Sequence, residues 1–189
     1  MLKIDYPIKT ARLELRPLTA ADLDDLYLYH SDPEVVRYMF WEPRNYEETR
    51  AKLEDTIIHA SKLTGEGTRL VLAVVLPDED KVIGELTLFW RSEEHQQGEI
   101  GFVFNPAYGG KGYATEAAEV GLVLGFEQLQ LHRIYGRCDG RNTASYKLME
   151  RLGMRREAHF VQNEIFKGEW GDELYYAILR EEWEENGEL

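Results

Sequence analysis

The sequence predicts a mixed α/β fold in which helices surround one central sheet. Three observations lead to this prediction. Three β-type runs, at about 69–76, 82–90 and 98–104, follow one another with only short turns between them. A glycine-rich loop at 109–112 then leads directly into a helix-forming segment. The complete order of expected elements, β-α-α-β-β-β-α-β-α-β-β, contains no internal repeat.

Length and composition indicate one globular unit with an acidic surface. The 189 residues are 43% hydrophobic, which is enough for a core, and no linker-like stretch interrupts them, so we expect a single domain over residues 1–189. The 22 basic and 35 acidic residues give a net charge of −13. This charge would repel a phosphate backbone and attract cations, so we expect no nucleic-acid partner.

Cysteine and hydropathy patterns indicate a cytoplasmic protein. Cys138 is the only cysteine, which rules out an internal disulfide and suits a reducing compartment. The first ten residues do not resemble a secretory signal, and the longest apolar run, 70–76, is too short to span a membrane. No metal site is expected, because no metal-site spacing is found among the five histidines: His30, His59, His95, His132 and His159.

The amino-terminal part is predicted to contain one strand and two helices. The segment RLELRPLT (12–19) alternates in polarity and contains Pro17, which is typical of a strand. Thr19 is placed to cap a helix that runs to about residue 32, with apolar side chains at helical spacing and acids in its first turn. A second helix is expected from Tyr46 to about Leu63.

The remaining elements are expected to form the sheet and its crossover. Turn-forming segments at 77–80 and 91–97 separate the three central strands, so these should be antiparallel neighbours. The helix after the glycine loop should connect the third of them to a parallel neighbouring strand by a right-handed crossover. The expected later elements are a helix at about 113–129, a strand at 133–139, a helix at 142–152 and strands near 157–166 and 172–180.

The glycine loop has two interpretations. Gly109, Gly110 and Gly112 leave main-chain amides uncovered just before a helix amino terminus, where a phosphate or pyrophosphate is stabilised. The alternative is a turn that requires positive backbone angles. A Walker loop does not fit, because Lys111 is followed by glycine. A dinucleotide fingerprint would need a third glycine where Thr115 stands.

The segment GGKGYATEA resembles a signature of the GNAT acetyltransferase superfamily, with Gly112, Tyr113 and Ala114 at its later positions. Gly109 stands where this signature usually has Gln or Arg. NTASYKLMERLGM (142–154) resembles the second superfamily signature. The segments at 10–27 and 163–183 are similar to the Rim-type branch, the ribosomal-protein N-acetyltransferases and their relatives. The resemblance covers about residues 10–183.

This resemblance implies the GNAT fold, a mostly antiparallel sheet with one parallel, splayed strand pair, and acetyl-CoA as acetyl donor. The pyrophosphate would lie on the amides of about 110–115, and the pantetheine arm would pair with the main chain of 102–104 in the way an added strand does. Members of the superfamily are often dimers, so a homodimer is one option. The implied cofactor-binding residues are Phe102, Val103, Phe104, Gly109, Gly110, Lys111, Gly112, Tyr113, Ala114, Thr115, Asn142 and Ser145.

Two residues are expected to carry the chemistry. Glu164 matches the position of the base proposed for Rim-type enzymes, and alternation places Phe160 and Phe166 on its strand face, where burial would raise its pKa. Without the resemblance it would be a solvated strand carboxylate. Ser145 matches a serine proposed to act near the sulfur, although it could instead bond local amides. Met149 stands where many members have a proton-donating tyrosine.

The function predicted is N-acetyltransfer from acetyl-CoA to a primary amine by direct attack in a ternary complex. The acceptor would be a protein N-terminus or a small cationic amine. Two alternatives remain open: a non-catalytic acyl-CoA-binding module and an NAD(P)-dependent oxidoreductase. The acceptor pocket is expected between 20–63 and the hairpin loop 166–173, and its suggested lining is Trp41, Glu42, Glu85, Trp90, Glu99 and Trp170.

Overall fold

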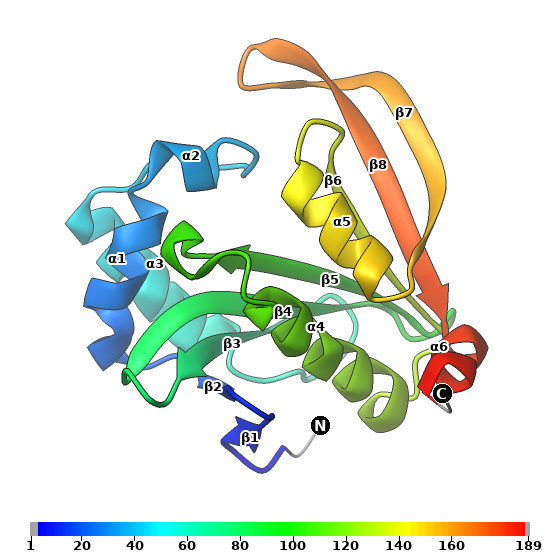
Figure 1. The fold of residues 1–189 in the computed structure, drawn as a ribbon, viewed down its shortest axis with the longest axis horizontal. Coiled ribbons are helices and arrows are strands. Elements are labelled where there is room, and N and C mark those ends of the chain that lie inside the picture. Colours follow the sequence, from blue (N-terminus) through cyan, green and yellow to red (C-terminus); the bar gives the residue numbers. More distant parts are fainter. Residues whose placement is uncertain (1–3, 188–189) are drawn as a thin grey trace.

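The computed structural model of the chain describes residues 4–187, which form an eight-stranded mixed sheet with helices on both faces (Figure 1). The strand order across the sheet is β1-β2-β3-β4-β5-β6-β8-β7. The strands are β1 (Ile8–Lys9), β2 (Glu14–Pro17), β3 (Arg69–Leu76), β4 (Lys81–Ser92), β5 (Gln97–Phe104), β6 (Arg133–Asp139), β7 (Arg155–Phe166) and β8 (Glu169–Leu179). The α-helices are α1 (Leu23–His30), α2 (Pro33–Val36), α3 (Tyr46–His59), α4 (Tyr113–Val123), α5 (Thr143–Arg151) and α6 (Arg180–Gly187).

Two hydrophobic clusters cover the two faces of the central strands. One joins alternate residues of β3, including Leu70 and Leu72, to α4 and α5. The other joins the intervening residues, including Val71 and Ala73, to α1 and α3. Because β3 is buried on both faces, its sequence is continuously apolar rather than alternating.

The predicted fold class is confirmed, and so is the strand pairing on which it depends. β3, β4 and β5 pair antiparallel in sequence order. β5 and β6 are parallel neighbours on either side of the α4 crossover, as the handedness rule predicts. Their pairing runs only from Gln97↔Arg133 to Glu99↔Tyr135, and beyond this point the two strands diverge.

Several elements differ from the sequence prediction. β1, α2 and α6 were not expected; they are short or, in α6, so rich in acids that the apolar spacing is obscured. The helix expected at 113–129 is α-helical only to Val123 and continues as a π-helical turn through Gln128. α3 ends at His59. The next residue, Ala60, is buried, and its main-chain oxygen accepts a hydrogen bond from Val71 N of β3 (2.7 Å). None of the described helices is both long and apolar enough to span a membrane.

Replacement of Gly84 by alanine tests the packing between β4 and the end of β5. A Cβ at Gly84 would lie 2.4 Å from Phe104 Cδ1 and 2.7 Å from the main-chain oxygen of Val103. Because this oxygen belongs to a paired strand, we expect Gly84→Ala to lower the free energy of unfolding by about 1–3 kcal/mol, measured by urea denaturation. Gly65→Ala is the control, since a Cβ there meets nothing within 4 Å. Equal midpoints for the two variants would contradict this account.

Candidate active site

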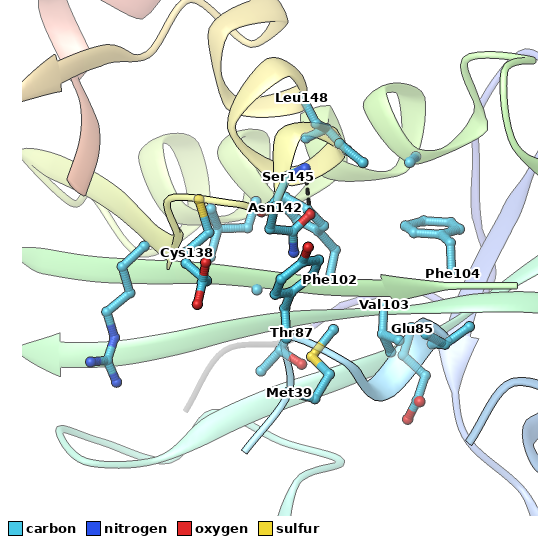
Figure 2. A pocket seen from close by; sticks show the side chains of 18 of the residues that line it. Met39, Glu85, Thr87, Phe102, Val103, Phe104, Cys138, Asn142, Ser145 and Leu148 are labelled. Atoms are coloured by element: carbon cyan, nitrogen blue, oxygen red, sulfur yellow. Dashed lines mark hydrogen bonds between the residues drawn. The ribbon is translucent and has the colours of Figure 1, made fainter. Parts of the chain in front are cut away.

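A large cavity opens where β5 and β6 diverge. Its volume is about 1210 Å³, above the roughly 300–1,000 Å³ of common small-ligand sites, so it has room for two molecules together. Residues from β4, β5, β6, α5, the segment 34–44 and the β7–β8 hairpin line it. Figure 2 shows Phe102, Val103 and Phe104 of β5 between the α5 side of the cavity and the side that holds Met39, Glu85 and Thr87.

The glycine loop forms one end of this cavity. Gly110 and Gly112 have φ values of 75° and 83°, so the loop does require positive backbone angles. Gly112 is the N-cap of α4, and a Cβ on Gly110 would meet no atom within 4 Å. The bare main chain therefore faces open space at the positive end of α4. The loop therefore has the positive backbone angles of the turn interpretation, and its open main chain leaves room for a phosphate-bearing ligand.

The amino-terminal segment holds this loop from behind. Glu116, in the first turn of α4, accepts hydrogen bonds from Thr10 Oγ1 (2.6 Å), Arg12 N (2.9 Å) and Arg12 Nε (2.7 Å). Arg12 Nη1 also donates to the main-chain oxygen of Lys111 (2.8 Å). Burial alone would raise the pKa of Glu116, but the bonds from Thr10 and Arg12 outweigh burial and hold that pKa below its ordinary value. The carboxylate is thus engaged by the amino-terminal segment and paired with the Arg12 guanidinium.

The predicted cofactor residues gather around the cavity with one exception. Phe102 and Phe104 line it and also pack against the core, which agrees with the mixed role expected from alternation. The side chain of Lys111 lies outside the lining, with Nζ 5.8 Å from the centre of the Tyr108 ring. The predicted residues that do line the cavity are Phe102, Val103, Phe104, Gly109, Gly110, Gly112, Tyr113, Ala114, Thr115, Asn142, Ser145 and Glu164.

The amino terminus of α5 closes the cavity opposite β5. Asn142 caps the helix, since its Oδ1 accepts a hydrogen bond from Ser145 N at 3.1 Å, drawn as a dashed line in Figure 2. Cys138 of β6 lies beside Ser145, and burial raises the pKa of its thiol to about 11. Met149 is buried against Gly136 of β6 and also contributes to the cavity lining.

Glu164 lies on the hairpin that forms the outer wall. It is opposite Gly171 of β8 and only partly buried. The uninterrupted alternation predicted for this strand does not hold, because the register shifts between Phe160 and Glu164 and Gln162 has a φ of 50°. Phe166 is buried, whereas Phe160 is 45% exposed, so the aromatic surroundings expected for Glu164 are present on one side only.

Two charged networks occupy the cavity side of β4 and β5. In the first, His30 Nε2 lies 2.6 Å from Glu85 Oε2 and His30 Nδ1 lies 3.2 Å from Arg44 Nη1. In the second, Arg137 bridges Glu99 (3.3 Å) and Glu173 (3.1 Å). Burial alone would lower the pKa of Arg137, but the adjacent Glu99 carboxylate raises it above its ordinary value. The carboxylates at the cavity floor therefore have partners within the protein.

The expected acceptor lining is partly found. Trp41, Glu85 and Glu99 line the cavity, while Glu42, Trp90 and Trp170 do not. Sequence reasoning missed several functional candidates, namely His30, Arg44, Arg137 and Glu173. Their partners are distant along the chain, since His30 and Glu85 are 55 residues apart, so local spacing contains no signal for them.

Comparison with known proteins agrees with this geometry. Residues 12–155 match the acetyltransferase (GNAT) domain family. The chain belongs to this family of N-acetyltransferases. It is similar to the uncharacterized N-acetyltransferase YnaD of Bacillus subtilis (strain 168), with 40% identity over 176 residues that cover 93% of this chain and 98% of YnaD.

Two further proteins are similar to this chain. The crystal structure of a GNAT-family acetyltransferase from Bacillus anthracis is similar at a TM-score of 0.82 and 37% identity, covering 92% of this chain and 98% of the other. Spermidine N(1)-acetyltransferase of Escherichia coli (strain K12) is 27% identical over 171 residues, covering 90% of this chain and 88% of that enzyme. Acetyltransferases of the GNAT family use acetyl-CoA.

Substitution of Glu116 tests how the loop is held. Because its pKa is lower in the folded state, the carboxylate stabilises the fold above an ordinary pKa of about 4.3, and this stabilisation disappears as pH falls through the depressed folded value. We expect Glu116→Gln to lower the free energy of unfolding near neutral pH by about 1–2 kcal/mol, with the difference shrinking in acid. Urea denaturation over this pH range measures it.

The control for this substitution is Glu119→Gln, which changes an exposed carboxylate of the same helix. It should leave the unfolding free energy within about 0.5 kcal/mol of wild type. A Glu116→Gln deficit that stays constant from neutral to acidic pH would show that lost packing, rather than lost charge, is responsible.

Proposed function

We propose that this GNAT domain transfers acetyl from acetyl-CoA to a primary amine, by direct attack of the amine while both molecules are bound. One observation carries the proposal: a bare glycine loop at the amino terminus of α4 opens into the space where β5 and β6 separate. That arrangement offers donors for a pyrophosphate at one end and unpaired strand edge for an amide-bearing chain at the other.

The chain's own groups would hold the donor along this path. Main-chain amides of 110–115 would bind the pyrophosphate, with the α4 dipole adding favourable charge. The edge of β5 at 102–104, which does not pair with β6, would accept and donate main-chain hydrogen bonds to the pantetheine arm. Acetyl-CoA, when bound, supplies an activated thioester carbonyl.

Glu164 would act as the base. The acceptor amine must lose a proton to form the amide as the C–S bond breaks, and Glu164 is the cavity-lining carboxylate with no ion pair or hydrogen bond among the described residues. A free carboxylate can take the proton directly or through one water molecule. Glu85, Glu99 and Glu173 are engaged by other side chains, which makes them poorer acceptors of a proton.

Ser145 would stabilise the departing thiolate. Its main-chain N–H is taken by the Asn142 cap, whereas its hydroxyl faces the cavity side beside Cys138. A hydroxyl here can donate a hydrogen bond to developing negative charge on sulfur. Met149 has no proton to donate and is buried, so we assign no part in the reaction to it.

The acceptor is a small amine or a protein N-terminus in this proposal. Resemblance of the terminal segments to the Rim-type branch favours a protein N-terminus, and the similarity to an enzyme named for spermidine favours a small amine. The second candidate function, acyl-CoA binding without turnover, is supported by methionine at position 149. Release of CoA thiol in the presence of a panel of amines separates the two.

Removal of the proposed base should abolish most turnover but not donor binding. We expect Glu164→Gln to lower kcat by about 10²–10⁴-fold, the range for a general base, with the dissociation constant for acetyl-CoA unchanged. CoA-thiol release and calorimetric titration measure the two quantities. Glu169→Gln, in the same hairpin but outside the cavity lining, is the control. An unaltered rate and pH profile in Glu164→Gln would refute this assignment.

Alanine at Gly112 should weaken donor binding. A side chain at φ 83° is strained, so we expect the loop to shift; the added Cβ itself would make only an ordinary contact of 3.4 Å with Arg12 Nη2. We expect the KM for acetyl-CoA to rise on the order of tenfold, in keeping with about 1–2 kcal/mol of lost binding. Gly67→Ala, with φ 82° and no neighbour within 4 Å, carries the same backbone strain away from the site. Equal KM values for the two variants would argue against the loop as the pyrophosphate site.

A further inference from the structure

Arg44 is a half-buried guanidinium on the acceptor side of the cavity that lacks an anionic partner. Its side chain lines the cavity and stacks on Trp41, with Cζ 4.5 Å from the ring centre. Within residues 4–187 its one side-chain hydrogen-bond partner is His30 Nδ1, and no carboxylate lies within ion-pair distance of it. Glu85 and Glu48 act on Arg44 only through space. Most of its five N–H donors are therefore available to a ligand.

The guanidinium is held in a fixed direction. Arginine can only donate, so His30 Nδ1 must be the acceptor of the 3.2 Å contact. His30 Nε2 then carries the hydrogen that is donated to Glu85 Oε2 at 2.6 Å. The buried His30 thus connects Glu85 of β4 to Arg44, and the Trp41 ring stacks against the guanidinium. An arginine ordered before binding loses little entropy when it meets an anion.

Three glutamates of the cavity already have partners within the protein, although the whole chain has a net charge of −13. Glu85 is bonded to His30, and Glu99 forms an ion pair of 2.7 Å with Arg91. Glu173 is paired with Arg137 at 3.1 Å. A second cationic group on the acceptor would find these carboxylates occupied, so the acidity of the chain as a whole does not predict a polycationic acceptor.

Further hydrogen-bond donors lie on this wall of the cavity. The indole N–H of Trp41, next to Arg44, is covered and has no acceptor among the described residues. Lys52 and Arg69 also line the cavity here and share one carboxylate, Asp55, at 2.8 and 3.8 Å. Arg44 is the cation of the three that has no carboxylate of its own. Such a wall suits an oxygen-rich, negatively charged group.

We propose that the acceptor carries an oxyanion, in the simplest case a carboxylate, which binds Arg44 while the amine of the same molecule is acetylated. This inference rests on the proposed acetyltransfer and narrows its acceptor to zwitterionic amines. Arg44 is then a specificity-determining residue: it forms charge-assisted hydrogen bonds to the far end of the acceptor and takes no part in breaking or forming bonds.

A matched series of amines tests the inference. γ-Aminobutyrate, butylamine and putrescine each have four carbons and a primary amine at one end. Their other ends are a carboxylate, a methyl group and a second ammonium group, respectively. ε-Aminocaproate, hexylamine and hexamethylenediamine repeat the comparison with a longer chain. CoA-thiol release gives kcat/KM for each with wild-type protein. We expect the carboxylate member to exceed the alkylamine by about tenfold in at least one series, as for one charge-assisted hydrogen bond.

Arg44→Gln should reduce the carboxylate-to-alkylamine ratio of kcat/KM about tenfold, towards unity, by raising KM for the carboxylate member. Arg50→Gln is the control, because Arg50 is an exposed α3 residue paired with Glu47 outside the cavity lining, and it should keep the ratio. Preference of the wild type for a diamine, no preference, or a ratio unchanged in Arg44→Gln would overturn the inference.

If no amine of either series releases thiol, calorimetric binding to protein saturated with CoA decides the question. The carboxylate member must then bind more tightly than its alkylamine, and Arg44→Gln must remove the difference; absence of binding by all members rejects the inference. Failure of the proposed function has a separate signature, in which carboxylates bind in this Arg44-dependent way but no thiol is released with any amine.

Discussion

The separation of β5 from β6 is the constraint on which the rest of the site depends. The two strands share only the pairs from Gln97↔Arg133 to Glu99↔Tyr135. Immediately after the last pair, Gly136 lies so close to α5 that a Cβ would be 2.6 Å from Met149 Sδ. α5 therefore packs directly onto β6 at the point of divergence, while α4 packs onto β4 and β5. The two strands therefore separate between α4 and α5. The main-chain groups of β5 that face β6 are left unpaired there, while both helices still pack on the hydrophobic core.

Charge in this molecule is arranged differently inside and outside the cavity. The excess of acids belongs to the surface and to the helix termini, where carboxylates cap amide groups or pair with nearby bases. Inside the cavity the acids have partners, because an unpaired buried carboxylate is costly. Glu164 and Arg44 are the exceptions, and they lie on the hairpin and on the segment after α2. One free anion and one free cation in a shared cavity are the features that a zwitterionic acceptor would match.

The parts of the site that are contiguous in sequence could be predicted, and the parts assembled across the sheet could not. The glycine loop, the Asn142 cap and the β5 segment can each be predicted from neighbouring residues in the sequence. The structure brings all three to one cavity. The His30–Glu85 and Arg137–Glu99 contacts join residues 55 and 38 positions apart. The surroundings of Glu164 were predicted only in part. The register shift in β7 occurs in its pairing with β8, and the alternation of polar and apolar residues along β7 does not reveal it.

The sequence by itself determined the order of the elements, the antiparallel and parallel pairings and the position of a loop suited to phosphate, because hydrophobic period, turn residues and crossover handedness are local or nearly local properties. Only the tertiary structure decided where β5 and β6 part and which charges remain unpaired in the cavity. Those features arise from contacts between separate elements of the chain, such as Met149 of α5 against Gly136 of β6 and His30 of α1 against Glu85 of β4. No single stretch of the chain contains both members of such a contact, so its energy can be assigned only when the segments are brought together.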